Sequence, residues 1–174
     1  MNNFIKFKDL LENAEKYASL EAYTKALDCI NQAISLNIPL SRTQIIDAYS
    51  LRAQMRIAAG KNLESISDIN KVIEIDPNDS LMHLLRGIAI INYAGYEKAI
   101  LYFDKAIDQD DKSSETFYFR GVAKYHLENF YEAISDLDQA ITLDDKNSEP
   151  FYFRGVAKYH LENFYDAISD LDQA

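Results

Sequence analysis

Residues 117–140 read FYFRGVAKYHLENFYEAISDLDQA, and residues 151–174 repeat this stretch 34 positions later with one change, Glu132 to Asp166. Self-similarity at a fixed period of about 20–50 residues is typical of proteins built from stacked repeats. The period of this pair is therefore the first property to follow along the chain.

Small residues recur in three columns, and every spacing within a column is 34 residues except the first, which is 39. The columns are Ala14, Ala53, Gly87, Gly121 and Gly155; Ala26, Ser65, Ala99, Ala133 and Ala167; and Ala33, Val72, Ala106, Ala140 and Ala174. They predict one array over residues 1–174, with repeats at 7–40, 46–79, 80–113, 114–147 and 148–174, the last one incomplete.

Each repeat has the pattern of two helices. Ala133, Leu137 and Ala140 fall on one helical face, and residues 117–127 form a second apolar segment before a break at Glu128. Turn and N-cap residues separate the repeats at 76–80, 110–114 and 144–148. The expected fold is all-α, made of antiparallel helix pairs. Helices of about 12–15 residues are marginal alone in water, so we expect stacking to stabilise them.

Two local features refine this prediction. Gly87, Gly121 and Gly155 lie inside predicted helices, where glycine costs about 1 kcal/mol relative to alanine. We therefore expect close approach of the partner helix at these positions. Ser41 and Gln44 match a capping box, which predicts a lengthened helix that begins near Arg42; the alternative is a slightly longer loop.

A column of arginines precedes a column of mostly acidic residues by sixteen positions. The arginines are Arg52, Arg86, Arg120 and Arg154, and their counterparts are Asp68, Tyr102, Asp136 and Asp170. The first repeat has Asn13 and Cys29 at these positions, so both members are absent together. This favours ion pairs that join the two helices of a repeat; the alternative is that the arginines bind an acidic ligand.

Composition limits the class of protein. With 18 Lys and Arg against 28 Asp and Glu, the net charge is −10, which repels phosphate backbones and disfavours nucleic acid as a partner. No apolar run approaches the length of a membrane span, and the N-terminus shows no secretory signal. The single Cys29 suits a reducing compartment, so we expect a cytoplasmic protein with no membrane partner.

Residues for catalysis do not converge in this sequence. His126 and His160 are copies of one repeat position, too far apart to share a metal directly, and no phosphate loop or nucleophile elbow appears. We expect no enzyme activity, no metal site and no cofactor.

The 34-residue helix–turn–helix period, its three small-residue columns and the Asp76-Pro77-Asn78 ending resemble the tetratricopeptide repeat. The resemblance covers residues 7–174. It departs from the family at Asp111 and Asp145, which replace a closing proline, and at Lys124 and Lys158, where the family often has tyrosine. It implies a right-handed α-α superhelix, or solenoid, whose first helices line a concave groove.

The second apolar side of these first helices is the predicted binding site; the alternative is that neighbouring helices cover much of this side. It consists of Leu81, Leu84, Ile88, Ile91, Tyr118, Val122, Tyr125, His126, Tyr152, Val156 and Tyr159, with His160 beside them. Some family members bind chaperone C-termini through a clamp of Lys, Asn and Arg. Leu11, Glu15, Leu51, Leu81 and Leu85 occupy the corresponding positions here, so that partner class is disfavoured.

Two functions remain open at this point. The first is a protein-interaction scaffold that binds a peptide or amphipathic helix with apolar anchors and basic residues. The alternative is a structural or self-associating segment of a longer repeat protein. It rests on Phe164, Ile168 and Leu171, which we expect to lack part of their cover.

Overall fold

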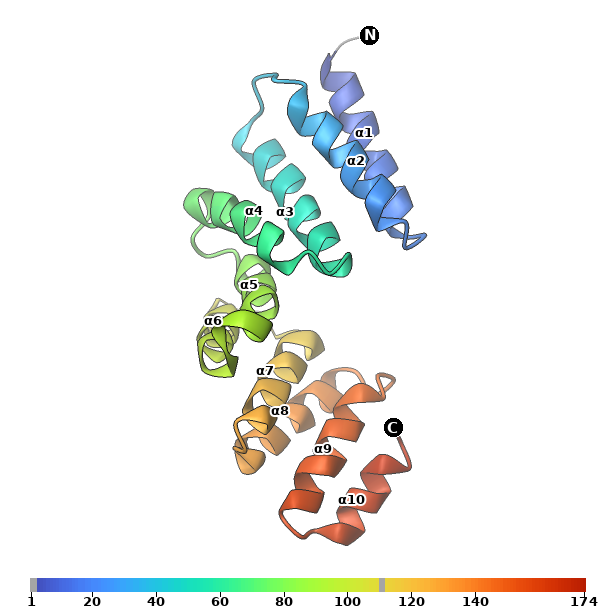
Figure 1. Cartoon of the computed structure of the whole chain (residues 1–174), viewed down its shortest axis with the longest axis vertical. Helices are drawn as coiled ribbons and strands as arrows, with labels where there is room; N and C mark the ends of the chain where they lie inside the picture. Colours follow the sequence, from blue (N-terminus) through green and yellow to red (C-terminus); the bar gives the residue numbers. More distant parts are fainter. Residues whose placement is uncertain (1–2, 110–111) are drawn as a thin grey trace. The chain divides into compact units, whose positions relative to one another are not determined.

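The computed structural model describes residues 3–109 and 112–174, with the side chains of 92–94 also left undescribed. The turn predicted at Asp110 and Asp111 lies outside the described residues. In the described part of the chain all regular structure is helical (Figure 1). The helices are α1 (Asn3–Ala18), α2 (Tyr23–Ser35), α3 (Arg42–Ala58), α4 (Asn62–Ile75), α5 (Ser80–Ala94), α6 (Tyr96–Asp108), α7 (Ser114–His126), α8 (Phe130–Leu143), α9 (Glu149–His160) and α10 (Phe164–Leu171).

The helix ends follow the local sequence. The Ser41 hydroxyl accepts a hydrogen bond from the backbone N–H of Gln44, and Gln44 Oε1 accepts one from the backbone N–H of Ser41. These two bonds confirm the capping box predicted before α3. The turns within repeats place Glu21, Gly60, Glu128 and Glu162 in the left-handed region, with φ of 55°, 72°, 61° and 62°. One such residue reverses the chain between the two helices of a repeat, at the predicted break.

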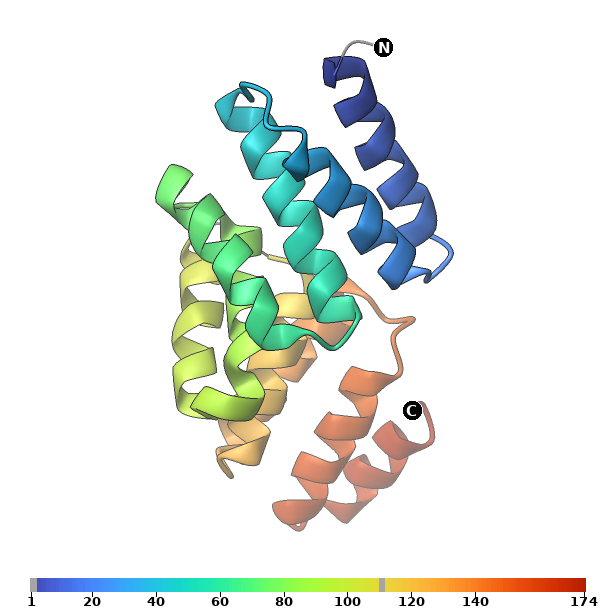
Figure 2. The same ribbon diagram turned by 45° about the horizontal axis from the view of Figure 1, so that its top comes forward.

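The chain divides into two compact units, Met1–Leu85 and Arg86–Ala174, and the boundary falls inside α5. In the first unit α2 packs against both α1 and α3, as Figure 2 also shows, and α3 packs against α4. Its core includes Ala14, Ala26, Ile30 and Met55. A second cluster consists of Phe7, Ala33 and Ala48.

In the second unit α7 packs against α6 and α8, and α9 packs against α8, α7 and α10. The small-residue columns lie at these contacts: Ala99, Ala133 and Ala167 are buried. A Cβ on Gly121 would lie 2.9 Å from Leu137 Cγ and 3.3 Å from the Ala133 carbonyl oxygen. The expected close approach at the helix glycines is confirmed.

Candidate functional site

A buried carboxylate holds the two helices of most repeats together. Arg120 donates to both oxygens of Asp136, from Nε at 2.9 Å and from Nη2 at 2.6 Å, and Lys124 Nζ lies 2.7 Å from Oδ2. Arg154, Lys158 and Asp170 repeat this arrangement at 2.9, 2.6 and 2.7 Å. The predicted pairing of the two columns is confirmed, and each aspartate binds a second cation that the sequence prediction missed.

The first unit uses the same arrangement with arginine as the second cation. Arg52 donates to Asp68 at 2.9 and 2.7 Å, and Arg56 Nη1 lies 2.6 Å from Asp68 Oδ2. Arg56, Lys124 and Lys158 share one repeat position, which Ile90 fills in the third repeat, where Tyr102 replaces the aspartate. The second cation and the aspartate are therefore either both present or both absent in these repeats, and this correlation could have predicted the second cation.

These ion pairs shift the pKa of the buried carboxyl and guanidinium groups. Burial alone raises the pKa of Asp170, but hydrogen bonds and attraction from Arg154 and Lys158 outweigh it and lower that pKa. Burial likewise disfavours the charged form of Arg154, but the hydrogen bonds of Arg154 to Asp170 and Asp138 outweigh this effect and raise the pKa of Arg154. Arg52, Arg120 and Arg154 therefore have structural partners and are not free to bind an acidic ligand.

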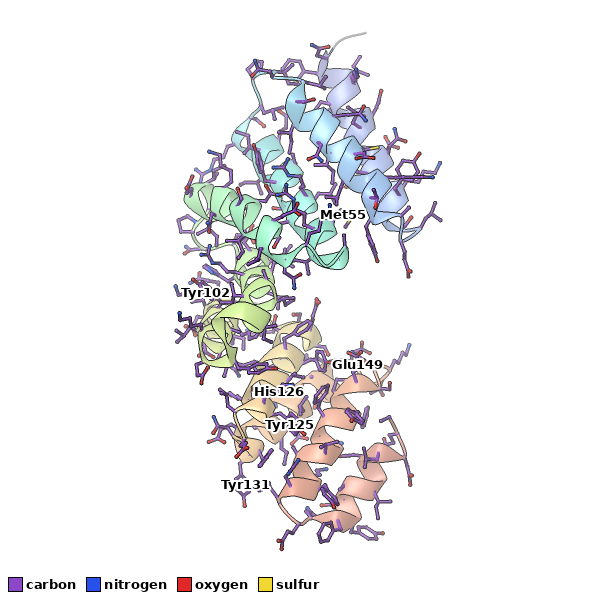
Figure 3. All side chains as sticks on the ribbon, viewed as in Figure 1. Met55, Tyr102, Tyr125, His126, Tyr131 and Glu149 are labelled. Carbon is purple, nitrogen blue, oxygen red and sulfur yellow. The ribbon has the colours of Figure 1, made fainter. Side chains whose placement is uncertain are left out.

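Aromatic side chains of α7 and α9 form a connected surface, which we call the aromatic surface. Tyr125 lies at its centre, with ring centroids 5.6 Å from Phe153 and 6.0 Å from His160. Tyr118 lies 6.0 Å from Phe153, and Tyr152 lies 5.3 Å from the same ring. Figure 3 shows Tyr125 and His126 beside α9 and Tyr131 pointing away from them.

The predicted site residues differ in exposure. Leu81, His126, Tyr152 and Tyr159 are exposed; Ile88, Ile91, Tyr118, Tyr125 and Val156 are half-buried; Leu84 and Val122 are buried. Buried Leu84 and Val122 have little surface for a ligand. Leu81 and Leu84 belong to the first unit, and the contacts among the others lie in the second.

His126 and His160 have a role that the sequence prediction missed. The His160 ring stacks on Phe130 at 4.7 Å with an interplanar angle of 2°, and His126 stacks on Tyr96 at 4.5 Å and 14°. Each histidine follows its aromatic partner by 30 residues, a recurring spacing that could have indicated contact between successive repeats. Phe153, absent from the predicted set, joins the rings of the aromatic surface.

A cavity of about 410 Å³ adjoins the aromatic surface at the start of α7 and α9. Its lining includes Tyr118, Glu115, Asp144 and Glu149. Burial raises the pKa of Tyr118, and its hydrogen bond to Glu149 and the negative charge of that residue raise it further. Tyr118 therefore stays protonated as a donor, in an acidic environment that suits a cationic side chain.

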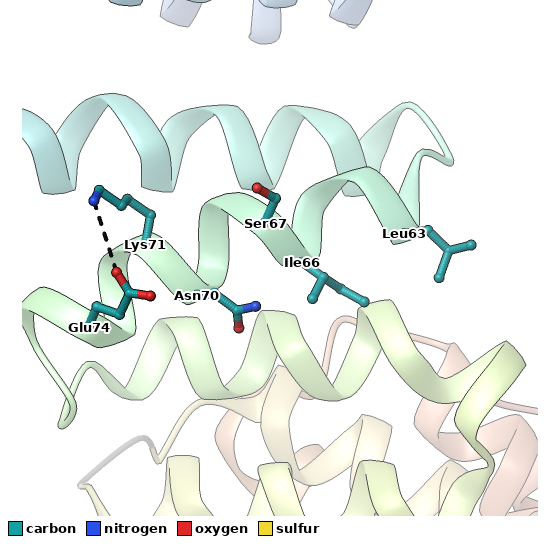
Figure 4. A pocket seen from close by; sticks show the side chains of 6 residues that line it. All are labelled: Leu63, Ile66, Ser67, Asn70, Lys71 and Glu74. Atoms are coloured by element: carbon teal, nitrogen blue, oxygen red, sulfur yellow. Dashed lines mark ion pairs between the residues drawn. The ribbon is translucent and has the colours of Figure 1, made fainter.

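A larger hollow of about 590 Å³ lies on α4 of the first unit (Figure 4). Its six lining residues all belong to α4, and Lys71 and Glu74, one helical turn apart, form an ion pair of 3.9 Å at one end of it. Their side chains spread along one helix and do not converge on a point (Figure 4). This hollow is a less suitable site than the aromatic surface.

The described residues hold no group of three or more His, Cys, Asp or Glu placed to bind a metal ion. In the same part of the chain, no helix combines the length and apolar character that crossing a membrane requires.

The profile of the tetratricopeptide repeat family matches residues 46–79 and 114–147, the bounds predicted for the second and fourth repeats. Solved repeat proteins match nearly the whole chain. The chain contains tetratricopeptide repeats. Its all-α fold is that of helical-repeat proteins that form a superhelix. No curated protein sequence matches it.

The similar solved structures show the fold of this chain. MamA from Desulfovibrio magneticus RS-1, residues 41 to the end, is 13% identical with a TM-score of 0.77, covering 97% of this chain and 92% of that one. YrrB, a TPR protein with an unusual peptide-binding site, is 18% identical with a TM-score of 0.66, covering 94% and 82%. The second TPR of Spaghetti, bound to the HSP90 peptide SRMEEVD, is 26% identical with a TM-score of 0.53, covering 56% and 91%.

Proposed function

We propose that this repeat protein is a non-enzymatic scaffold that binds a peptide or amphipathic helix on the aromatic surface of α7 and α9. The observation that supports this most directly is the exposure of Tyr152 and Tyr159 beside a connected set of rings. Tyrosine offers a large contact area with little rotamer entropy and a polar end, which suits peptide recognition. Peptide binding by YrrB and by the second TPR of Spaghetti agrees with such a role.

The negative charge around this surface favours a partner with basic residues. Glu115, Asp144 and Glu149 line the adjoining cavity, and the chain has a net charge of −10. An acidic rim favours a ligand with Lys or Arg next to its apolar anchors and repels an acidic one. The single free Cys29 agrees with a reducing compartment, and we include a cytoplasmic location in the proposal.

Selection from displayed random peptides tests this function. We expect enriched peptides to combine an aromatic or aliphatic anchor with Lys or Arg, and to lose binding to the Tyr152→Ala, Tyr159→Ala double variant. The matched control is Tyr131→Ala with Tyr165→Ala, since these exposed tyrosines lie on α8 and α10. Equal binding to both double variants, or no enrichment of basic peptides, would contradict the proposal.

The exposed face of α10 supports a second candidate, association through the last described helix pair. Ile168 and Leu171 are exposed there, and apolar helix faces left uncovered in a repeat array favour association. Sedimentation of the chain over a range of concentrations measures whether copies of it associate.

A further inference from the structure

The cavity of about 410 Å³ between the starts of α7 and α9 combines aromatic rings with negative charge. Tyr118 and Phe119 of α7 are half-buried and line it, with ring centroids 5.1 Å apart and planes tilted by 59°. Its acidic residues include Asp144, in the turn before α9, and Glu149, at the start of α9 (Figure 3). None of its described lining residues is Lys or Arg.

Two of these carboxylates have no cationic partner in the described chain. Asp144 Oδ1 accepts a hydrogen bond from the Lys146 backbone N–H, and Glu149 accepts one from the Tyr118 hydroxyl. Neither carboxylate forms an ion pair with a described Lys or Arg, whereas Asp136 binds two cations. Each therefore retains acceptor capacity for a cationic ligand.

The chain itself shows how a ring and a carboxylate together bind an arginine. Arg120 lies over the Phe117 ring, 5.6 Å from its centroid, and donates to Asp136. Arg52 and Arg154 have the same two kinds of partner. A guanidinium is planar, stacks on aromatic rings and presents a fork of N–H donors, whereas an ammonium is a compact, strongly hydrated charge. Rings beside two separated carboxylates therefore suit arginine better than lysine.

This chemistry does not recur in every repeat. The third repeat has Leu81 and Leu84 at the positions that Glu115 and Tyr118 hold in the fourth. Leucine supplies neither a ring nor a charge, so packing of successive helices does not itself require the acidic and aromatic residues. Their presence beside a cavity is consistent with a role in binding.

We propose, resting on the function given above, that this cavity binds one arginine side chain of the peptide or helix that occupies the aromatic surface. The guanidinium lies against the Tyr118 ring, and its N–H groups donate to Asp144 and Glu149. The partner is thereby defined further: the basic residue beside its apolar anchors is an arginine, and it binds at the start of α7 and α9.

The probe for this site is Nα-acetyl-arginine amide, titrated into the 174-residue chain while NMR follows the backbone amide shifts. We expect saturable shifts at Tyr118 and Glu149, with a dissociation constant of about 1–10 mM for a ligand of this size. Nα-acetyl-citrulline amide has nearly the same shape without the charge and should bind about tenfold more weakly. Nα-acetyl-lysine amide should bind about threefold more weakly than the arginine amide.

Variants assign the binding to the cavity. Glu149→Gln should weaken binding of the arginine amide about threefold and leave that of the citrulline amide unchanged, since only the charged ligand uses the carboxylate charge. Tyr118→Leu introduces the residue found at Leu84 and should remove the preference for arginine over lysine. The matched control is Glu132→Gln, because Glu132 is an exposed glutamate of α8 outside the cavity lining and its loss should leave the binding unchanged.

Four results would overturn the proposal: no saturable shift at the cavity, equal binding of the citrulline amide, equal binding of the lysine amide, or equal binding by the wild-type and Glu149→Gln chains. The ligand comparisons use the wild-type chain, so they decide the matter even where a variant does not fold. Failure of the function is a different observation. Selected peptides that bind without Tyr152 and Tyr159 contradict the function, whereas binding of the arginine amide at the cavity is measured without any peptide.

Discussion

Asp136 shows how a single carboxylate stabilises a helix pair. It is 4% exposed and binds Arg120 and Lys124 from the preceding helix, so each charge is compensated where water is excluded. Such a site is sensitive to loss of one member, because the cations left behind are then uncompensated.

The same chemistry explains why the third repeat, which has Tyr102 in place of the aspartate, also lacks the second cation at Ile90. Arg86 instead lies over the Tyr102 ring, 5.2 Å from its centroid.

We predict that Asp136→Asn lowers the free energy of unfolding by about 3 kcal/mol, because it leaves Arg120 and Lys124 facing a neutral group. Urea denaturation followed by circular dichroism measures the change. Asp138→Asn is the control: Asp138 also pairs with an arginine, but its side chain is 50% exposed, so the loss should stay below about 1 kcal/mol. Equal losses at the two positions would contradict the role of burial.

Asp170 makes stability dependent on pH. Its pKa is lowered in the folded chain, whereas the pKa of an aspartate in the unfolded chain is about 3.9. Its stabilising contribution is therefore fully present above the unfolded pKa and is lost as the pH falls through the folded pKa. In urea denaturation from about pH 6 downward, the stability difference between wild type and Asp170→Asn should shrink once the pH falls below about 4. A difference that stays constant to the lowest pH would show that the charge is not responsible.

At the scale of a helix, the glycine column sets the distance between the two helices of a repeat. A side chain at Gly121 would meet Leu137, which is fully buried, and the Ala133 carbonyl oxygen. A Cβ on Gly155 would lie 3.0 Å from Leu171 Cγ and 3.1 Å from the Ala167 carbonyl oxygen, so the backbone is equally close there, but Leu171 is exposed and lies at the end of α10. The two positions are alike in sequence and differ in their freedom to relax.

Gly121→Ala should therefore destabilise the chain by about 1–3 kcal/mol, because overpacking outweighs a gain in helix propensity of about 1 kcal/mol. Gly155→Ala should cost less, since Leu171 can move toward solvent. Thermal melts of the two variants measure the comparison. An unchanged or raised melting temperature for Gly121→Ala would exclude the close approach as the reason for glycine.

The helices, their breaks and the arginine–aspartate pairs could be predicted from the sequence because they repeat at fixed spacing. The stacking of His126 and His160 on the preceding repeat was missed, since the period alone does not show which side of a helix meets which neighbour. The predicted binding residues illustrate the same limit. Val122 and Tyr152 both lie on the second apolar side, but only Tyr152 is exposed, which depends on how neighbouring helices cover that side.

At the scale of the whole molecule, the aromatic and acidic residues of α6 and α8 that contact the next repeat do not occur in every repeat. Asn62 and Asn70 of α4 stand where α6 has Tyr96 and Asp104, and Asn92 stands where α7 has His126. The chain also divides into its two compact units inside α5. In a repeat array, stability is approximately the sum of the stability of each repeat and of each nearest-neighbour interface, so different parts of the array can differ in stability.

We therefore predict that Met1–Leu85 and Arg86–Ala174 unfold in separate steps. Hydrogen exchange at increasing urea concentration should show α1–α3 and α7–α9 losing protection at different concentrations, because opening of one unit does not require opening of the other. Asp136→Asn provides an internal check, since it should lower protection in α7, α8 and α9 and leave α1–α3 unchanged. Loss of protection at one common urea concentration, shifted equally throughout by Asp136→Asn, would instead establish a single cooperative unit.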